Sequence, residues 1–172
     1  MSTVVTVELP DAALAADVVD GLALVEDGLQ AAARAEHDLL AETAAYGMDA
    51  GGKRFRATLV LLAAQFGNSR DPRVIPAAVA IELTHLATLY HDDVMDEADV
   101  RRGMPSANAR WGNSVAILAG DFLFAKASLI LAGLGPEAVK IQAETFTRLV
   151  TGQTAETIGP RPGKIRWSIT WA

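Results

Sequence analysis

The feature that most constrains this 172-residue chain is a long apolar stretch, residues 77–98, that ends in acidic side chains. Its apolar pattern predicts one continuous helix, and Pro76 fits the first turn of such a helix. Steps of three or four residues place one row of side chains on a single helical face: Ile81, His85, Thr88, Asp92 and Asp96. Asp93 borders the same face, because it lies three residues before Asp96.

Three carboxylates on one helical face are a candidate metal site. Carboxylates within about 6 Å of one another repel, so a helix keeps them at low cost only in water or next to a multivalent cation. Mg²⁺ typically takes one or two carboxylates and completes its octahedron with water and phosphate oxygens. The sequence therefore predicts that Asp92, Asp93 and Asp96 bind Mg²⁺. The alternative is a solvated acidic helix end, and the apolar stretch with His85 on the same face argues against it.

Two basic segments accompany the carboxylates. Arg101 and Arg102 follow the acidic helix at a predicted turn, and two guanidiniums beside a metal cluster are suited to holding a polyanion between them. Lys53 and Arg56 stand three residues apart at a predicted helix start behind two glycines, where free backbone N–H groups also favour an anion. Taken alone, the arginines could instead pair with the aspartates, and His85 could be a satisfied core histidine.

The remaining sequence predicts an all-α fold. We expect a helix that begins after an N-cap at Asp11 and continues towards Leu40, followed by a loop over residues 46–52. The other expected elements are helices over residues 55–66, 114–131 and 136–151 and a turn over residues 101–105. Residues 1–10 read as a short arm, and residues 164–172 as an atypical tail that contains two of the three tryptophans.

Composition excludes several classes of protein. The chain is 51% hydrophobic, which excludes a disordered protein, and its net charge of −6 gives no general electrostatic reason to bind nucleic acid. No cysteine is present, so disulfide and thiolate chemistry are absent. The most apolar stretch, residues 115–134, contains Asp121 and Lys126, which favours a buried core helix over a transmembrane segment. No secretory signal is visible, so the expected location is the cytoplasm.

Together these segments resemble the trans-polyprenyl diphosphate synthases, the head-to-tail prenyl chain elongators. The segments that carry the resemblance are GGKRFR at 51–56, HLATLYHDDVMDEADVRRG at 85–103, LAGDFLFAKA at 118–127 and GQTAE at 152–156. The middle segment joins the first aspartate-rich motif of that family, DDxxD, to its RRG sequel, and this joint spacing is highly specific. The resemblance implies an isoprenoid-synthase antiparallel helical bundle around a deep apolar cavity.

The resemblance also implies a role for each site residue. Asp92, Asp93 and Asp96 would hold Mg²⁺ that bridges an allylic diphosphate, and Arg101 would grip that diphosphate. Isopentenyl diphosphate would be bound by four side chains: Lys53, Arg56, His85 and Arg102. The small residues Ala87 and Thr88, which precede the aspartates by about one turn, would set product length and favour a medium or long chain. Family members are usually homodimers.

The chain departs from the family after Gly163. Residues 11–163 match the N-terminal part of the bundle, whereas no second DDxxD motif follows. A site with metal ligands on two facing walls would need that motif, so we expect little activity from this chain alone. The sequence from Lys164 onwards no longer resembles the family, and we interpret this change as a truncation or frame shift. Two alternatives stand beside an impaired synthase: a diphosphate-binding or partner subunit, and a class I terpene cyclase. The cyclase is disfavoured by GGKRFR and RRG, since it has no isopentenyl diphosphate to hold.

Overall fold

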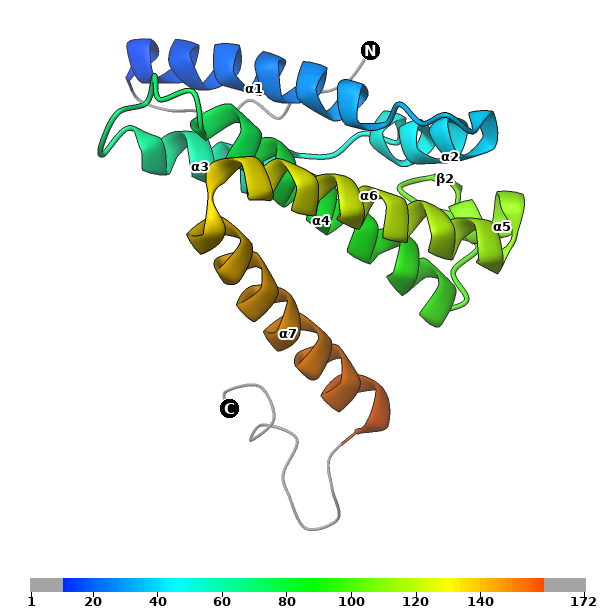
Figure 1. Ribbon diagram of the computed structural model, residues 1–172. Coiled ribbons are helices and arrows are strands. Elements are labelled where there is room, and N and C mark those ends of the chain that lie inside the picture. The colour runs from blue at the N-terminus through cyan, green and yellow to red at the C-terminus, as the bar shows by residue number, and fades with distance from the viewer. Residues whose placement is uncertain (1–10, 160–172) are drawn as a thin grey trace. The chain divides into compact units, whose positions relative to one another are not determined.

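A computed structural model describes residues 11–159, in which the regular elements are helices and one small hairpin (Figure 1). The helices are α1 (Ala12–Ala32), α2 (Asp38–Asp49), α3 (Phe55–Ala64), α4 (Val74–Met95), α5 (Ala107–Trp111), α6 (Asn113–Leu134) and α7 (Pro136–Ile158). The strands β1 (Val100–Arg101) and β2 (Met104–Pro105) pair antiparallel. The predicted all-α class is confirmed. The expected arm at 1–10 and tail at 164–172 lie outside the described residues.

The start of α1 follows the sequence prediction. Asp11 is the N-cap, and its carboxylate accepts hydrogen bonds from the backbone N–H of Ala13 at 2.8 Å and of Leu14 at 3.1 Å. The buried face of the helix repeats with helical spacing: Val18, Leu22, Val25 and Leu29.

The predicted continuation of this helix towards Leu40 is wrong. The helix ends at Ala32, and α2 begins at Asp38 and runs to Asp49, through most of the loop expected at 46–52. The separate α2 buries Thr43, Ala44 and Met48, which α1 could not have done by continuing in a straight line. Burial of this second apolar face therefore accounts for the break.

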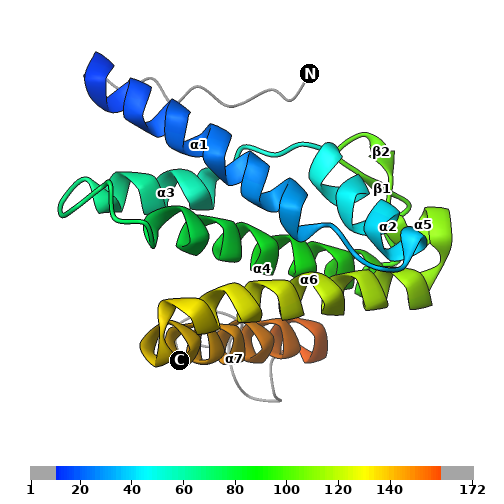
Figure 2. The same ribbon diagram turned by 45° about the horizontal axis from the view of Figure 1, so that its top comes forward.

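The core lies between α4 and α6, which run side by side in opposite directions (Figures 1 and 2). Small residues allow the two helices to approach closely. The fully buried small residues of α4 and α6 are Ala78, Ala80, Ala87, Ala116, Ala119 and Ala127. A side chain larger than alanine at a buried position of this kind would displace the surrounding helices.

Both α4 and α6 are long and apolar enough to cross a membrane by length and composition. However, the two helices pack against each other, and charged residues interrupt both, among them Asp93 on α4 and Lys126 on α6. This arrangement is that of two core helices of a bundle, as predicted for residues 115–134.

One end of the bundle is closed by α2, the β1–β2 hairpin and α5, which gather around the C-terminal half of α4 (Figure 2). Tyr90 of α4 fastens α2 to this end, because its hydroxyl donates to the carbonyl of Thr43 and accepts from the N–H of Gly47 at 2.9 Å. A methyl group on Gly47 would collide with the Tyr90 ring. Gly47 is therefore required for this contact.

Among the described residues, 135–159 form a second unit. Within it, α7 extends seven residues beyond the predicted end at Thr151 and stops at Ile158, where Gly159 takes a positive φ of 76°. The GQTAE segment lies on this helix.

Candidate diphosphate-binding site

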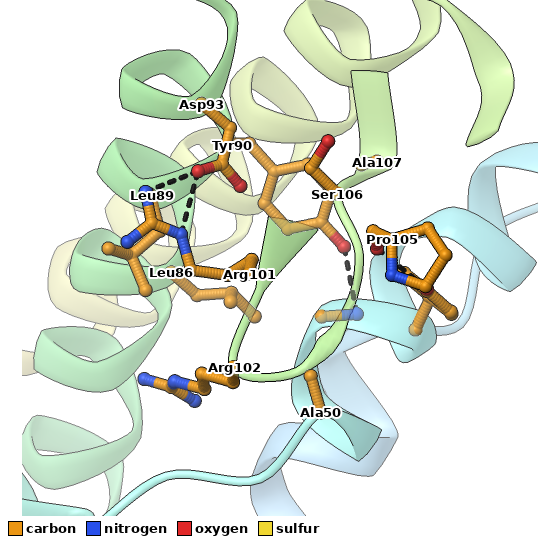
Figure 3. Close-up of a pocket in the computed structure, with 12 residues that line it drawn as sticks. Ala50, Leu86, Leu89, Tyr90, Asp93, Arg101, Arg102, Pro105, Ser106 and Ala107 are labelled. Carbon is orange, nitrogen blue, oxygen red and sulfur yellow. Dashed lines mark hydrogen bonds and ion pairs between the residues drawn. The ribbon is translucent and has the colours of Figure 1, made fainter. Parts of the chain in front are cut away.

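The β1–β2 hairpin presents the two consecutive arginines. Arg102 and Gly103 occupy its turn with positive φ angles of 53° and 79°, and the register pairs Arg101 with Met104. Two positive φ angles in a two-residue loop match the twist of a tight hairpin, and the glycine takes one of them without strain. Both arginine side chains extend from the hairpin towards α4 (Figure 3).

Asp93 is turned towards this hairpin. Its side chain is buried, with the residue 4% exposed, and one carboxylate oxygen accepts from both Nε of Arg101, at 2.7 Å, and Nη2 of the same guanidinium. This pairing raises the pKa of Arg101 above its ordinary value, chiefly through the hydrogen bond. Asp93 therefore orients Arg101 in this structure.

Asp92 and Asp96 form the other part of the acidic motif. Asp92 is half-buried, whereas Asp96 is exposed at the C-cap of α4, one helical turn further on. Burial raises the pKa of Asp92, and repulsion from Asp96 adds to that shift. Within residues 11–159, no three His, Asp or Glu side chains converge as a preformed metal cluster. Two repelling carboxylates nevertheless fit Mg²⁺, which takes one or two from a protein and the rest from water and phosphate.

His85 lies where the two basic segments meet. Its pKa falls to about 4, first because the ring is buried and then because guanidiniums surround it. Those guanidiniums come from both segments: Arg56, Arg102, Arg101 and Arg54. The structure therefore brings the GGKRFR segment and the RRG hairpin to one place, and it holds His85 neutral at physiological pH.

Arg102 of the hairpin lies close to the GGKRFR segment. Burial lowers its pKa, and the nearby charge of Arg54 lowers it further. Its guanidinium lies so near Gly52 that a methyl group there would sit 2.7 Å from Nη1. The glycine thus leaves room for the arginine side chain rather than for a ligand.

Lys53 and Arg56 are both exposed, and within residues 11–159 neither is held by a hydrogen bond or an ion pair. Arg54 between them differs, because it pairs with Glu26 of α1. The start of α3 differs from the sequence interpretation as well. There the buried carboxylate of Glu82 accepts from the N–H of Ala57 at 3.0 Å, so part of the expected anion site is filled internally.

Sequence reasoning missed Glu26, Arg54 and Glu82. The one available signal was Glu82, a carboxylate within an apolar stretch and three residues before His85. Nothing local marks Glu26, since its partner lies 28 residues away in the chain.

The two candidate chain-length residues have different surroundings. Ala87 is 1% exposed, and its carbonyl lies close to Gly120 of α6. Thr88 is half-buried, and its hydroxyl donates to the carbonyl of His85 at 2.7 Å. Thr88 shares the helical face of Asp92, four residues later, whereas Ala87 belongs to the contact between α4 and α6.

A small cavity of about 30 Å³ lies between α4, α2 and the hairpin (Figure 3). Its walls include Leu86, Leu89 and Tyr90 of α4 and the Asp93–Arg101 pair. A volume of this size holds water but not a prenyl diphosphate.

Comparison with known proteins identifies the relatives of this chain. The profile of the Polyprenyl synthetase family matches residues 37–168, five residues past the expected end of family-like sequence at Gly163. A nonaprenyl diphosphate synthase of Mycobacterium tuberculosis is 54% identical over 159 residues, which are 92% of this chain and 48% of that protein.

Solved structures agree with these sequence matches. A geranylgeranyl pyrophosphate synthase of Corynebacterium glutamicum, crystallised with calcium and isoprenyl diphosphate, is 51% identical with a TM-score of 0.80, over 91% of this chain and 48% of that one. A decaprenyl diphosphate synthase of Rhodobacter capsulatus is 31% identical with a TM-score of 0.84, over 91% and 49%. This chain thus spans about half the length of these relatives, and it belongs to the polyprenyl synthetase family, with the N-terminal part of an isoprenoid-synthase helical bundle.

Proposed function

We propose that this chain supplies one diphosphate-binding wall of a prenyltransferase that joins isopentenyl diphosphate to an allylic prenyl diphosphate. The observation that carries the proposal is the meeting of two cationic segments around a neutral His85, beside the carboxylates of α4. Such an arrangement suits two diphosphates, one held by arginine and lysine side chains and one held through a metal. The matched relatives are named as polyprenyl diphosphate synthases.

For the allylic diphosphate, we assign Asp92 and Asp96 as the Mg²⁺ ligands. Mg²⁺ bound there would offset the charge of the departing pyrophosphate. Arg101 would contact the same diphosphate, and Asp93 fixes the direction of its guanidinium. Arg101 occupies one carboxylate oxygen of Asp93, so a direct bond from Asp93 to the metal, as expected from the motif, would have to use its second oxygen.

For isopentenyl diphosphate, we assign Lys53, Arg56 and Arg102 as the cationic contacts. His85, neutral because of its lowered pKa, can donate one hydrogen bond to a phosphate oxygen without adding another charge to the cluster. Lys53 and Arg56 are exposed and have no partner in the described residues, so their side chains are free to turn towards a ligand.

The reaction then follows from the positions of charge. The allylic C–O bond breaks as pyrophosphate departs, and the double bond of isopentenyl diphosphate attacks the resulting carbocation to form a C–C bond. Loss of one proton completes a five-carbon extension. Water must be excluded from the carbocation. We expect a medium- to long-chain product, with the half-buried Thr88 near the path of the growing chain.

A second candidate is a subunit that completes its site with another chain. Two matched relatives, from Geobacillus stearothermophilus and Bacillus subtilis, are named as component 2 of heptaprenyl diphosphate synthase. A homodimer is the other arrangement that we propose, and we place the chain in the cytoplasm. A class I terpene cyclase is disfavoured, since it would leave the cluster of Lys53, Arg56 and Arg102 without a ligand.

Calorimetric titration tests the proposal. Purified chain should bind isopentenyl diphosphate without metal and farnesyl thiodiphosphate only with Mg²⁺. Labelled isopentenyl diphosphate with an allylic partner should then show whether turnover occurs with this chain alone. Binding without turnover is the result that we expect of this chain alone. Turnover that appears only when a second chain is added would favour the subunit, and absence of both binding events would refute the assignment of the site.

A further inference from the structure

Arg54 occupies an unusual position in the GGKRFR segment. It is the N-cap residue of α3 and has a positive φ of 44°, a region that residues other than glycine rarely adopt. Its side chain is only 9% exposed, although both neighbouring cations, Lys53 and Arg56, point to solvent. A buried charge and a disfavoured backbone angle at one residue indicate that the surrounding structure holds it there.

The contacts that hold Arg54 come from two helices. Its Nε and Nη2 donate to the two carboxylate oxygens of Glu26 on α1, Nη2 at 3.1 Å, and Nη2 also reaches the carbonyl of Met48 at 3.3 Å. The carbonyl of Arg54 accepts from the hydroxyl of Thr58 at 2.9 Å. A two-oxygen contact between a guanidinium and a carboxylate fixes direction as well as distance.

Glu82 holds the other side of the same segment. It is 6% exposed, and it accepts from the N–H of Ala57 in the first turn of α3. The segment is therefore fastened to α1 through Arg54 and to α4 through Ala57. Of the two side chains left facing outwards, Lys53 directly precedes the first attachment and Arg56 lies between the two.

We propose that Glu26 and Arg54 are a positioning pair for the isopentenyl diphosphate subsite, with Glu82 as the second anchor. Arg54 contacts no substrate in this assignment. It fixes the backbone from which Lys53 and Arg56 reach the diphosphate. This inference rests on the proposed function, and it adds residues that the sequence motif alone would either overlook or count among the ligands.

The direction in which removal of Glu26 changes ligand affinity distinguishes a positioning role from a purely electrostatic one. Glu26 is an anion near a site for anions, so its removal would strengthen ligand binding if only its charge mattered. Positioning predicts the opposite, since Arg54 without its partner no longer fixes the segment. The allylic site depends on Asp92, Asp96 and Arg101 and should be spared.

The test is calorimetry on the full chain with Glu26→Gln. We expect affinity for isopentenyl diphosphate to fall about tenfold or more, and affinity for Mg²⁺ with farnesyl thiodiphosphate to stay within about twofold. Asp17→Asn is the matched control: it also removes a negative charge from α1, but its partner Arg70 is 82% exposed. It should change neither affinity.

Four outcomes decide the matter. If Glu26→Gln loses affinity for isopentenyl diphosphate alone, the positioning role of Glu26 and Arg54 is supported. Unchanged or tighter binding of isopentenyl diphosphate overturns that role. An equal loss of affinity for both ligands also overturns that role, because a general folding defect would explain it. If wild-type chain binds no isopentenyl diphosphate, the proposed function itself fails and the inference falls with it. Should Glu26→Gln not fold, Glu26→Asp keeps the charge, shortens the reach and allows the same comparison.

Discussion

A single carboxylate oxygen of Asp93 accepts two hydrogen bonds from the guanidinium of Arg101. The second aspartate of the DDxxD motif is thereby turned away from the first and third, and towards the hairpin. We propose from this relationship that the acidic motif has two functions: Asp92 and Asp96 bind the metal, and Asp93 orients an arginine. The division leads to separate predictions for the two neighbouring aspartates.

Asp93→Asn should destabilise the fold more than Asp92→Asn does. The amide keeps one acceptor but loses the charge that pairs with Arg101, so we expect the free energy of unfolding to fall by about 1–3 kcal/mol. Asp92→Asn relieves a repulsion with Asp96 and should leave stability unchanged or slightly increased. Urea unfolding followed by circular dichroism measures both. Equal destabilisation by the two variants would contradict this division.

Mg²⁺ should raise the melting temperature of the wild-type chain in the presence of inorganic pyrophosphate. A ligand that binds only the folded state at 100 times its Kd stabilises it by about 2.7 kcal/mol. The increase should disappear in the double variant Asp92→Asn/Asp96→Asn. Calcium at equal concentration and a chelator serve as comparisons in the same thermal scans. An increase that persists in the double variant would place the metal elsewhere.

The acidic motif also shows what a sequence can and cannot predict. Helical spacing placed Asp92 and Asp96 on one face, and the structure has them one turn apart on α4. The same spacing put Asp93 beside them, but its direction is decided by Arg101, which reaches it from the hairpin. The contact matches the alternative stated for the sequence, in which the arginines pair with the aspartates, but helical periodicity alone does not indicate which aspartate Arg101 contacts.

The break between α1 and α2 has a similar cause. Residues 33–37 contain neither glycine nor proline, so local sequence gave no reason to end the helix there. The chain breaks because Thr43, Ala44 and Met48 can then be buried in the bundle. The pairing of Glu26 with Arg54 could not be predicted from local sequence either, because it depends on how α1 packs near α3.

His85 should make stability depend on pH below neutrality. Its folded pKa is about 4, below the ordinary value of 6.5, so between these values the unfolded chain binds a proton that the folded chain does not. The free energy of unfolding should therefore fall as pH drops from about 6.5 towards 4, and no further contribution is expected below that. His85→Gln has no such proton and should show a flatter profile over this range.

The measurement is urea unfolding of both proteins at half-unit steps of pH. Nuclear magnetic resonance of the His85 ring gives a second check, with His85→Gln used to assign its signal. Isopentenyl diphosphate should raise the pKa of His85, because its negative charge offsets the four guanidiniums. A pKa that does not move with ligand would remove His85 from the subsite.

The chain-length hypothesis is better tested at Thr88 than at Ala87. Ala87→Phe would insert a ring into the tight contact between α4 and α6, and we expect it to cost about 1–3 kcal/mol or more of stability. Thr88→Phe has space at a half-buried position and should fold normally. In any preparation that turns over, Thr88→Phe should shorten the product, as measured by chromatography of the prenyl alcohols after dephosphorylation. Unchanged product length would refute a role for Thr88.

Gly120 should be essential to the packing of α6 beside the acidic motif. His91, the residue before Asp92, lies across this glycine, and its Nε2 is 3.2 Å from the carbonyl of Ile117 and 3.3 Å from the carboxylate of Asp121. A methyl group on Gly120 would lie 2.4 Å from His91 Nε2 and 3.2 Å from a backbone oxygen of α4, so the imidazole must move and the helices must separate.

We therefore expect Gly120→Ala to destabilise the chain by about 1–3 kcal/mol, despite the better helix propensity of alanine. Gly133→Ala on the same helix is the matched control, because nothing lies within 4 Å of the added methyl group. It should leave stability unchanged or raise it by up to about 1 kcal/mol. Both are measured by urea unfolding with a magnesium titration alongside, since displacement of His91 should also disturb Asp92. If the two variants were equally stable, the imidazole of His91 would not depend on the space that Gly120 leaves.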